Sequence, residues 1–151
     1  RKKGKIINFN NNIKKQINFL LPFFQHEWKD SIFGKNSLNN LLFLNLFESA
    51  ISNLKQQDKG VYLQENQGWE FAFIHVWKKY FNKQIIGFPH SSVRYWDLRY
   101  FYDSRSYDNE SNCDLPVPDK IACNGEFVKK MYFMSDFPKK NLIKVESLRY
   151  L

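Results

Sequence analysis

The spacing of apolar and polar residues in the second half of the chain predicts strands that alternate with helices. Two short apolar runs, Val61–Gln64 and Gln84–Phe88, predict buried strands. Between them, apolar residues recur at helical spacing and predict one helix, through Trp69, Phe73, Val76, Trp77 and Tyr80. This strand–helix–strand unit, followed by a loop to Asp103, is the predicted centre of the fold.

The same alternation continues after a long polar loop over residues 104–118. Lys120–Cys123 predicts a strand, Gly125–Ser135 a helix and Asn141–Val145 a further strand. The inward side of that helix is expected to carry Phe127, Val128, Met131 and Met134. Strands that alternate with helices are typical of an α/β fold with right-handed crossovers, so we expect a Rossmann-like parallel sheet flanked by helices.

Residues 1–36 form a basic N-terminal segment with helical pieces, which we assign to the same domain. Pro22 interrupts a helical stripe over residues 13–28, which predicts a kink or two shorter helices. Ser37 is a suitable N-cap for a helix to about Lys55. That helix is apolar over most of its circumference, so we expect it to be buried on more than one side. The α/β domain proper is then 37–140.

Length and charge limit the classes of function. The 151 residues can form one domain with a hydrophobic core but not two complete ones. The net charge is +8, and residues 1–35 supply +6 of it because they hold eight basic and two acidic residues. Such a charge favours an anionic partner: nucleic acid, a membrane surface or a phosphorylated metabolite. A nucleic-acid binder stays open as an alternative, although the sequence holds no recognised nucleic-acid motif.

Cofactor and targeting signals are absent from the sequence. Cys113 and Cys123 form no CxxC pair and have no clustered histidines near them, so we predict no metal site. No glycine-rich phosphate loop is present, and we predict no bound cofactor. The sequence has neither an apolar run of about 18 residues nor a signal peptide. We therefore expect a reduced, cytoplasmic protein.

Glu65 and His90 are the predicted catalytic residues, because each follows the end of a predicted strand. The carboxyl ends of parallel strands meet at one edge of a sheet, where ligands bind. A carboxylate at Glu65 could take a proton from an attacking hydroxyl, and His90 could donate to phosphate or act as acid or base. Alternatively, Glu65 or Asn66 caps the following helix, and His90 braces its loop by bonding to backbone.

The loop after His90 mixes aromatic rings with fixed charges. Arg94 and Asp97 are expected near the site, or else paired with one another, and arginines there would suit an acidic or phosphorylated acceptor. Glu70, one turn into the helix, is expected to fix the following loop by a salt bridge or hydrogen bond rather than to act in catalysis. The predicted ligand-contacting residues are Asn66, Glu70, Ser91, Ser92, Arg94, Asp97 and Arg99.

Four segments give the chain a family resemblance. ENQGWE (Glu65–Glu70), IIGFPHSSVRYWDLRYFYD (Ile85–Asp103), PDKIACNGEF and LIKVESLRYL resemble bacterial surface-carbohydrate biosynthesis proteins related to GT-B glycosyltransferases, which have two Rossmann domains. The resemblance covers roughly the last 90 residues. It implies transfer of a sugar from a nucleotide-activated donor to a glycan or lipid-linked acceptor, in capsule or lipopolysaccharide assembly.

The resemblance also implies that this chain is the acceptor-side, N-terminal half of a two-domain protein. The nucleotide-sugar donor would be held by a second, missing domain, and residues 141–151 would start the passage to it. On that expectation the isolated chain is inactive, and its basic N-terminal segment lies near anionic lipid at the inner face of the membrane. The alternative of another class is a glycan-binding or scaffold module without turnover.

Overall fold

The computed structural model describes residues 20–90, 97–107 and 115–146. Contacts divide the chain into two compact units, Arg1–Leu41 and Leu42–Leu151, and each is described by itself. Helix α2 (Leu21–Phe33) lies in the first unit, helix α3 (Lys35–Ser52) spans the boundary, and the remaining elements belong to the second unit. Among the described residues, no helix combines the length and the apolar character needed to cross a membrane.

Pro22 lies at the beginning of a helix, so of the two predicted alternatives the kink is wrong, and the two shorter helices stay a prediction. It lies in the first turn of α2, where the missing backbone N–H has no helical partner to lose. At the other end the Gly34 N–H donates to the Asp30 carbonyl, and α3 begins directly afterwards at Lys35. The helix therefore begins three residues before Leu38, the start that an N-cap at Ser37 predicts. The helical positions predicted before residue 20 lie outside the described residues.

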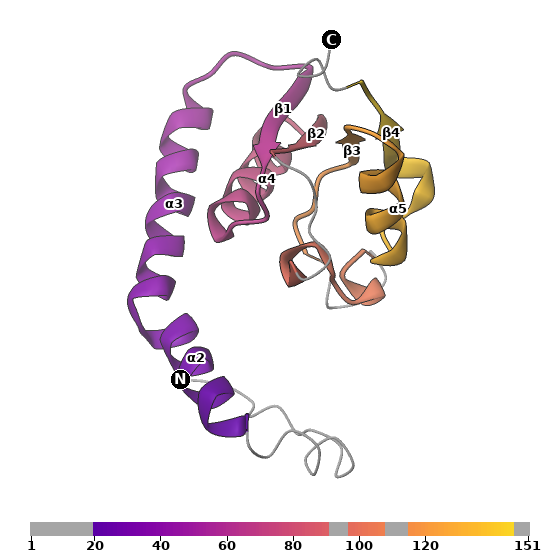
Figure 1. The fold of residues 1–151 in the computed structure, drawn as a ribbon. Coiled ribbons are helices and arrows are strands. Elements are labelled where there is room, and N and C mark those ends of the chain that lie inside the picture. Colours follow the sequence, from indigo (N-terminus) through magenta and orange to yellow (C-terminus); the bar gives the residue numbers. More distant parts are fainter. Residues whose placement is uncertain (1–19, 91–96, 108–114, 147–151) are drawn as a thin grey trace. The chain divides into compact units, whose positions relative to one another are not determined.

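The second unit is built on a four-stranded parallel sheet, which confirms the α/β class. Its strands lie in chain order, as Figure 1 shows: β1 (Lys59–Gln64), β2 (Gln84–Pro89), β3 (Lys120–Cys123) and β4 (Leu142–Lys144). Helix α4 (Gly68–Tyr80) connects β1 to β2, and helix α5 (Glu126–Met134) connects β3 to β4. Three single turns of 3-10 helix complete the unit, at Leu98–Tyr100, Ser104–Tyr107 and Lys139–Asn141.

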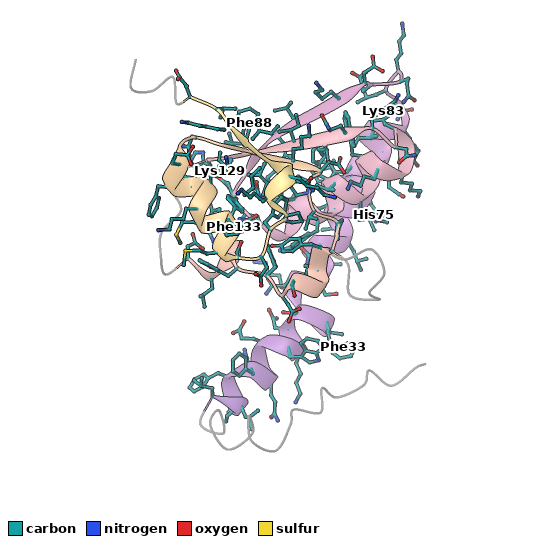
Figure 2. The ribbon with its side chains drawn as sticks, turned by 90° about the vertical axis from the view of Figure 1, so that its right-hand side faces the viewer. Phe33, His75, Lys83, Phe88, Lys129 and Phe133 are labelled. Atoms are coloured by element: carbon teal, nitrogen blue, oxygen red, sulfur yellow. The ribbon has the colours of Figure 1, made fainter. Side chains whose placement is uncertain are left out.

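Helices cover one face of this sheet. Along β1, Gly60, Tyr62 and Gln64 are buried, while the alternate residues Val61 and Leu63 are 59% and 54% exposed. Figure 2 shows α4 and α5 on the same side of the strands, with Phe88 on the other. A sheet whose described strands run in chain order has no reversal of strand order, so it lacks the crevice that such a reversal opens in doubly wound folds. The carboxyl edge itself remains available to ligands.

Two apolar clusters hold the helices against the sheet. One lies under α4 and the other under α5; their buried members are Ile51, Tyr62, Ile74, Val76, Trp77, Phe81 and Ile85 in the first, and Tyr100, Ile121, Cys123, Val128, Met131, Tyr132, Phe137 and Leu142 in the second. Tyr132 is buried in α5 where the sequence predicted Phe127 and Met134, which are exposed.

Helix α3 is less buried than its composition suggested. Ile51 is buried, and Leu44 and Phe47 pack partly against the α4 cluster. Leu42 and Leu46 are exposed, so the expected burial on more than one side is wrong for the part of α3 in this unit. Phe47 contacts Trp69 and Phe73 of α4 through its ring, which places this end of α3 on the helical side of the sheet.

Candidate functional site at the carboxyl edge of the sheet

The turn between β1 and α4 determines where Glu65 lies. Asn66 has a left-handed backbone conformation, with φ of 55°, which asparagine adopts more readily than most residues. Gln67 is the N-cap of α4. The Glu70 carboxylate oxygen Oε1 accepts the backbone N–H of Glu65 at 2.8 Å and that of Gln67 at 2.9 Å. Glu70 therefore fixes the turn before it, whereas the sequence suggested the loop after it.

Glu70 is turned inward, away from solvent. Its residue is 3% exposed, and the Tyr62 hydroxyl also hydrogen-bonds to its carboxylate. Burial raises the pKa of Glu70, and the two backbone N–H donors oppose that rise because they stabilise the charged form. A carboxylate held in this way organises the backbone of the site from within.

Glu65 and His90 meet at the outer side of the same edge. The His90 backbone N–H donates to the Gln64 carbonyl at 3.0 Å, which extends the pairing of β1 and β2 to the end of both strands. The Glu65 Oε1 and His90 Nε2 atoms are then 4.0 Å apart, with side chains 40% and 57% exposed. That separation is longer than a hydrogen bond, so both groups can turn to a ligand. The structure thus brings the two predicted catalytic residues together.

Asp97 and Arg99 form a bidentate ion pair. Arg99 donates from Nε to Asp97 Oδ1 at 2.8 Å and from Nη2 to Oδ2 at 2.7 Å. The bond to Asp97 is the main cause of the raised pKa of Arg99, and the field of Glu65 adds to it. From the sequence we expected, as one of two alternatives, that Asp97 would pair with Arg94, and we did not predict its pair with Arg99. Arg94, Ser91 and Ser92 lie outside the described residues.

A polar recess lies on the helical side of the sheet, behind the turn. It is lined by polar side chains together with apolar residues of α4, of the segment 116–121 and at Phe137, and its polar members are Tyr62, Gln64, Asn66, Gln67, Glu70, Tyr102, Tyr107 and Tyr132. The sequence analysis placed only Asn66 and Glu70 of these at the site. Gln64 was the available signal, because a polar residue at an inward strand position must find partners inside the protein.

Other clusters of ionisable residues in the described ranges have a structural explanation. A second hollow is lined by His75, Lys78 and Lys79 of α4, but Lys78 pairs with Asp119 at 2.9 Å and Lys79 pairs with Glu48. Across the described residues, no group of three or more His, Cys, Asp or Glu side chains is placed to hold a metal ion. Cys123 is buried in β3, and burial raises the pKa of its thiol to about 11.

Comparison with known proteins adds no assignment to this geometry. No protein-family model, curated protein or solved structure significantly matches the chain.

Proposed function

We propose that this chain is the acceptor-side α/β domain of a surface-polysaccharide glycosyltransferase of the GT-B type. The observation that carries the proposal is the Glu65–His90 pair, an exposed carboxylate and an imidazole 4.0 Å apart at the carboxyl ends of adjacent parallel strands. This edge of a parallel sheet is where α/β proteins bind ligands. The four sequence segments that resemble surface-carbohydrate enzymes supply the class of reaction.

In this proposal Glu65 is the general base. Its carboxylate takes the proton of an acceptor hydroxyl as that oxygen attacks the anomeric carbon of the donor sugar, and the bond from that carbon to the nucleotide phosphate breaks. His90, when protonated, donates a hydrogen bond to the negative charge that develops on the departing phosphate. The nucleotide itself is held by a second domain, so this chain alone binds the acceptor and does not complete the transfer.

The Asp97–Arg99 pair bears on which acceptor fits. Both guanidinium donors that face Asp97 are used by its carboxylate. Arg99 therefore brings little uncompensated positive charge to the edge, and the described part of the site favours an uncharged acceptor over the acidic or phosphorylated one suggested by the sequence.

The test is ligand-observed NMR of the chain against short glycans, nucleotide sugars and free nucleotides. Glycans should bind and nucleotides should not, and Glu65→Gln and His90→Asn should each weaken glycan binding. Asp58→Asn and His75→Asn are the controls, because both residues are exposed and lie away from the carboxyl edge, Asp58 just before the amino end of β1 and His75 within α4.

Two outcomes contradict the proposal. Glycan binding that ignores Glu65→Gln and His90→Asn would indicate a glycan-binding module without catalysis. Binding of nucleic acid that weakens steeply with salt, with no glycan binding, would favour the basic nucleic-acid binder.

A further inference from the structure

The polar recess contains polar atoms whose hydrogen bonding is incomplete within the described protein. They are Gln64 Oε1, Asn66 Nδ2 and the Tyr132 hydroxyl, each buried and without a partner at full hydrogen-bond geometry among the described residues, although the Asn66 amide lies close enough to the Tyr132 hydroxyl to act on it as a weak hydrogen-bond donor. Gln64 and Tyr132 are each 3% exposed. Leaving such a group unpaired costs about 1–3 kcal/mol, so the unpaired Gln64 Oε1 and the incompletely paired Asn66 and Tyr132 favour an occupant that supplies the missing hydrogen bonds.

These three atoms are close to one another. Gln64 Nε2 donates to Asn66 Oδ1 at 2.8 Å, so the two amides are in contact. The Asn66 side chain also lies beside the Tyr132 hydroxyl and offsets part of the rise that burial causes in the pKa of Tyr132. Gly87 on β2 makes room for the Gln64 amide, since a Cβ at this position would come within 2.5 Å of Gln64 Oε1.

The pairing of the two amides leaves one donor and one acceptor unpaired. In the present orientation these are Asn66 Nδ2 and Gln64 Oε1. If both amides were turned over, Asn66 Nδ2 would donate to Gln64 Oε1, and the unpaired atoms would be one amide nitrogen and one amide oxygen again. The recess therefore offers a donor, an acceptor and a hydroxyl that can act as either.

The chemistry of the recess suits an uncharged occupant. A hydroxyl group can accept from the amide and from Tyr132 while donating its proton to the amide oxygen, which a phosphate or carboxylate oxygen cannot do. Among the described residues that line the recess there is no lysine or arginine, and Glu70 adds a carboxyl group. Burial raises the pKa of Tyr62, Tyr107 and Tyr132, and that of Tyr102 to about 12, so these phenols are neutral at physiological pH.

The size of the recess limits what enters it. The recess offers about 20 Å³ to a water-sized group, enough for a single one, within about 340 Å³ of space that includes open solvent. Aromatic rings of Phe71, Tyr102 and Tyr107 line the recess and pack edge to face against one another, which gives it apolar walls.

We propose that the polar recess is a subsite for one neutral hydroxyl or hydroxymethyl group of an uncharged sugar, and that a water molecule occupies it in the free protein. The sugar part of this inference rests on the proposed function and names the acceptor class. The buried polar atoms of Gln64, Asn66 and Tyr132 then hydrogen-bond to one hydroxyl of the acceptor and so determine which sugar binds. Glu65 and His90 contact the same acceptor at the carboxyl edge of the sheet.

The experiment uses methyl glycosides of glucose, galactose and mannose as neutral probes, with glucuronate and glucose 6-phosphate as charged ones, observed by saturation-transfer NMR. At least one neutral glycoside should bind the chain and the charged sugars should not. Tyr132→Phe and Gln64→Met should each weaken binding by about 2- to 12-fold, the equivalent of one hydrogen bond. Tyr80→Phe, at an exposed tyrosine, is the control and should leave binding unchanged.

Thermal unfolding of every variant confirms that it folds. If Gln64→Met does not fold, Tyr132→Phe and Asn66→Gly decide the question, because glycine tolerates the left-handed backbone at residue 66. The subsite is overturned if no neutral glycoside binds, or if binding is the same in the wild type and these variants. Binding that ignores Tyr132→Phe but weakens in Glu65→Gln rejects the subsite and leaves the proposed function standing. The reverse pattern rejects the function and retains the subsite.

Discussion

Glu65 and Glu70 are two carboxylates five residues apart, on opposite sides of one turn and in opposite environments. Glu65 lies in the outer layer of the site, partly exposed and 4.0 Å from His90. Glu70 lies in the inner layer, buried, with Oε1 bonded to two backbone N–H groups and the carboxylate to the Tyr62 hydroxyl. The inner carboxylate fixes the backbone, and this leaves the outer one available for chemistry.

The two layers should therefore respond differently to substitution. An exposed ion pair contributes about 0–1 kcal/mol to stability. The Glu65–His90 pair should therefore contribute little to the stability of the fold. Buried polar groups that satisfy backbone donors contribute more, because their loss leaves those donors unpaired. Inner-layer changes should lower the stability of the domain, and outer-layer changes should alter binding with little effect on stability.

The largest effect is expected for Glu70→Ala. It leaves the backbone N–H groups of Glu65 and Gln67 without their acceptor, which should lower the free energy of unfolding by about 3 kcal/mol. Urea denaturation measures the change. Glu126→Ala, at an exposed carboxylate paired with Lys144, should cost less than about 0.5 kcal/mol. Equal costs for the two variants would mean that the inner layer does not hold the turn.

A smaller loss is expected for Gly60→Ala, on the buried side of β1. A Cβ at this position would come within 2.8 Å of the Trp77 ring, and a packed ring has little room to move. We expect the free energy of unfolding to fall by about 1–3 kcal/mol in denaturant titrations. Gly87→Ala meets the ends of the Gln64 and Tyr62 side chains rather than a packed ring, and it should cost less. A neutral Gly60→Ala would show that β1 packs more loosely against α4 than described.

The buried carboxylate should also produce a pH dependence. Because the folded pKa of Glu70 is raised above the ordinary value of 4.5, the native state binds more protons than the unfolded state between the two pKa values. The stability of the wild type relative to Glu70→Gln should therefore be highest below pH 4.5 and decline as the pH rises through the raised pKa. Unfolding curves at a series of pH values test this, and a difference that rises with pH would contradict the burial of Glu70.

The smallest effects on stability are expected in the outer layer. Glu65→Gln and His90→Asn should each change the free energy of unfolding by less than about 0.5 kcal/mol, because both side chains are substantially exposed. Calorimetry or denaturant titration at neutral pH measures this. A loss of 2 kcal/mol or more in either variant would assign that residue to the fold rather than to a ligand.

Much of the second unit could be predicted from the sequence because its signals are local. The strands β1 and β2 and the helix α4 follow from hydrophobic spacing, and Lys120–Cys123 matches β3. Glu65 and His90 were predictable together because each follows a strand end, and neighbouring parallel strands end at the same edge. Pro22 could have predicted the start of α2, because the residue that breaks a helix interior is favoured in a first turn.

The features that the sequence did not predict depend on the three-dimensional arrangement of the chain rather than on local spacing. The polar recess needs Gln64 from β1, Tyr132 from α5 and Tyr102 from the connection between β2 and β3, and no spacing rule joins residues so far apart. The Asp97–Arg99 pair spans two residues, a separation that brings side chains together only because the chain there forms a single 3-10 turn. The exposure of Leu42 and Leu46 likewise depends on what packs against α3, which composition does not specify.

The central claim is that Glu65 and His90 act together on one glycan acceptor, and a double-mutant cycle on binding tests it most directly. Glycan affinity is measured for the wild type, Glu65→Gln, His90→Asn and the double variant. If both side chains contact the same acceptor group, the two losses should not add, with a coupling energy of at least about 0.5 kcal/mol. Additive losses would mean separate contacts, and no loss in any variant would contradict a glycan site at this edge.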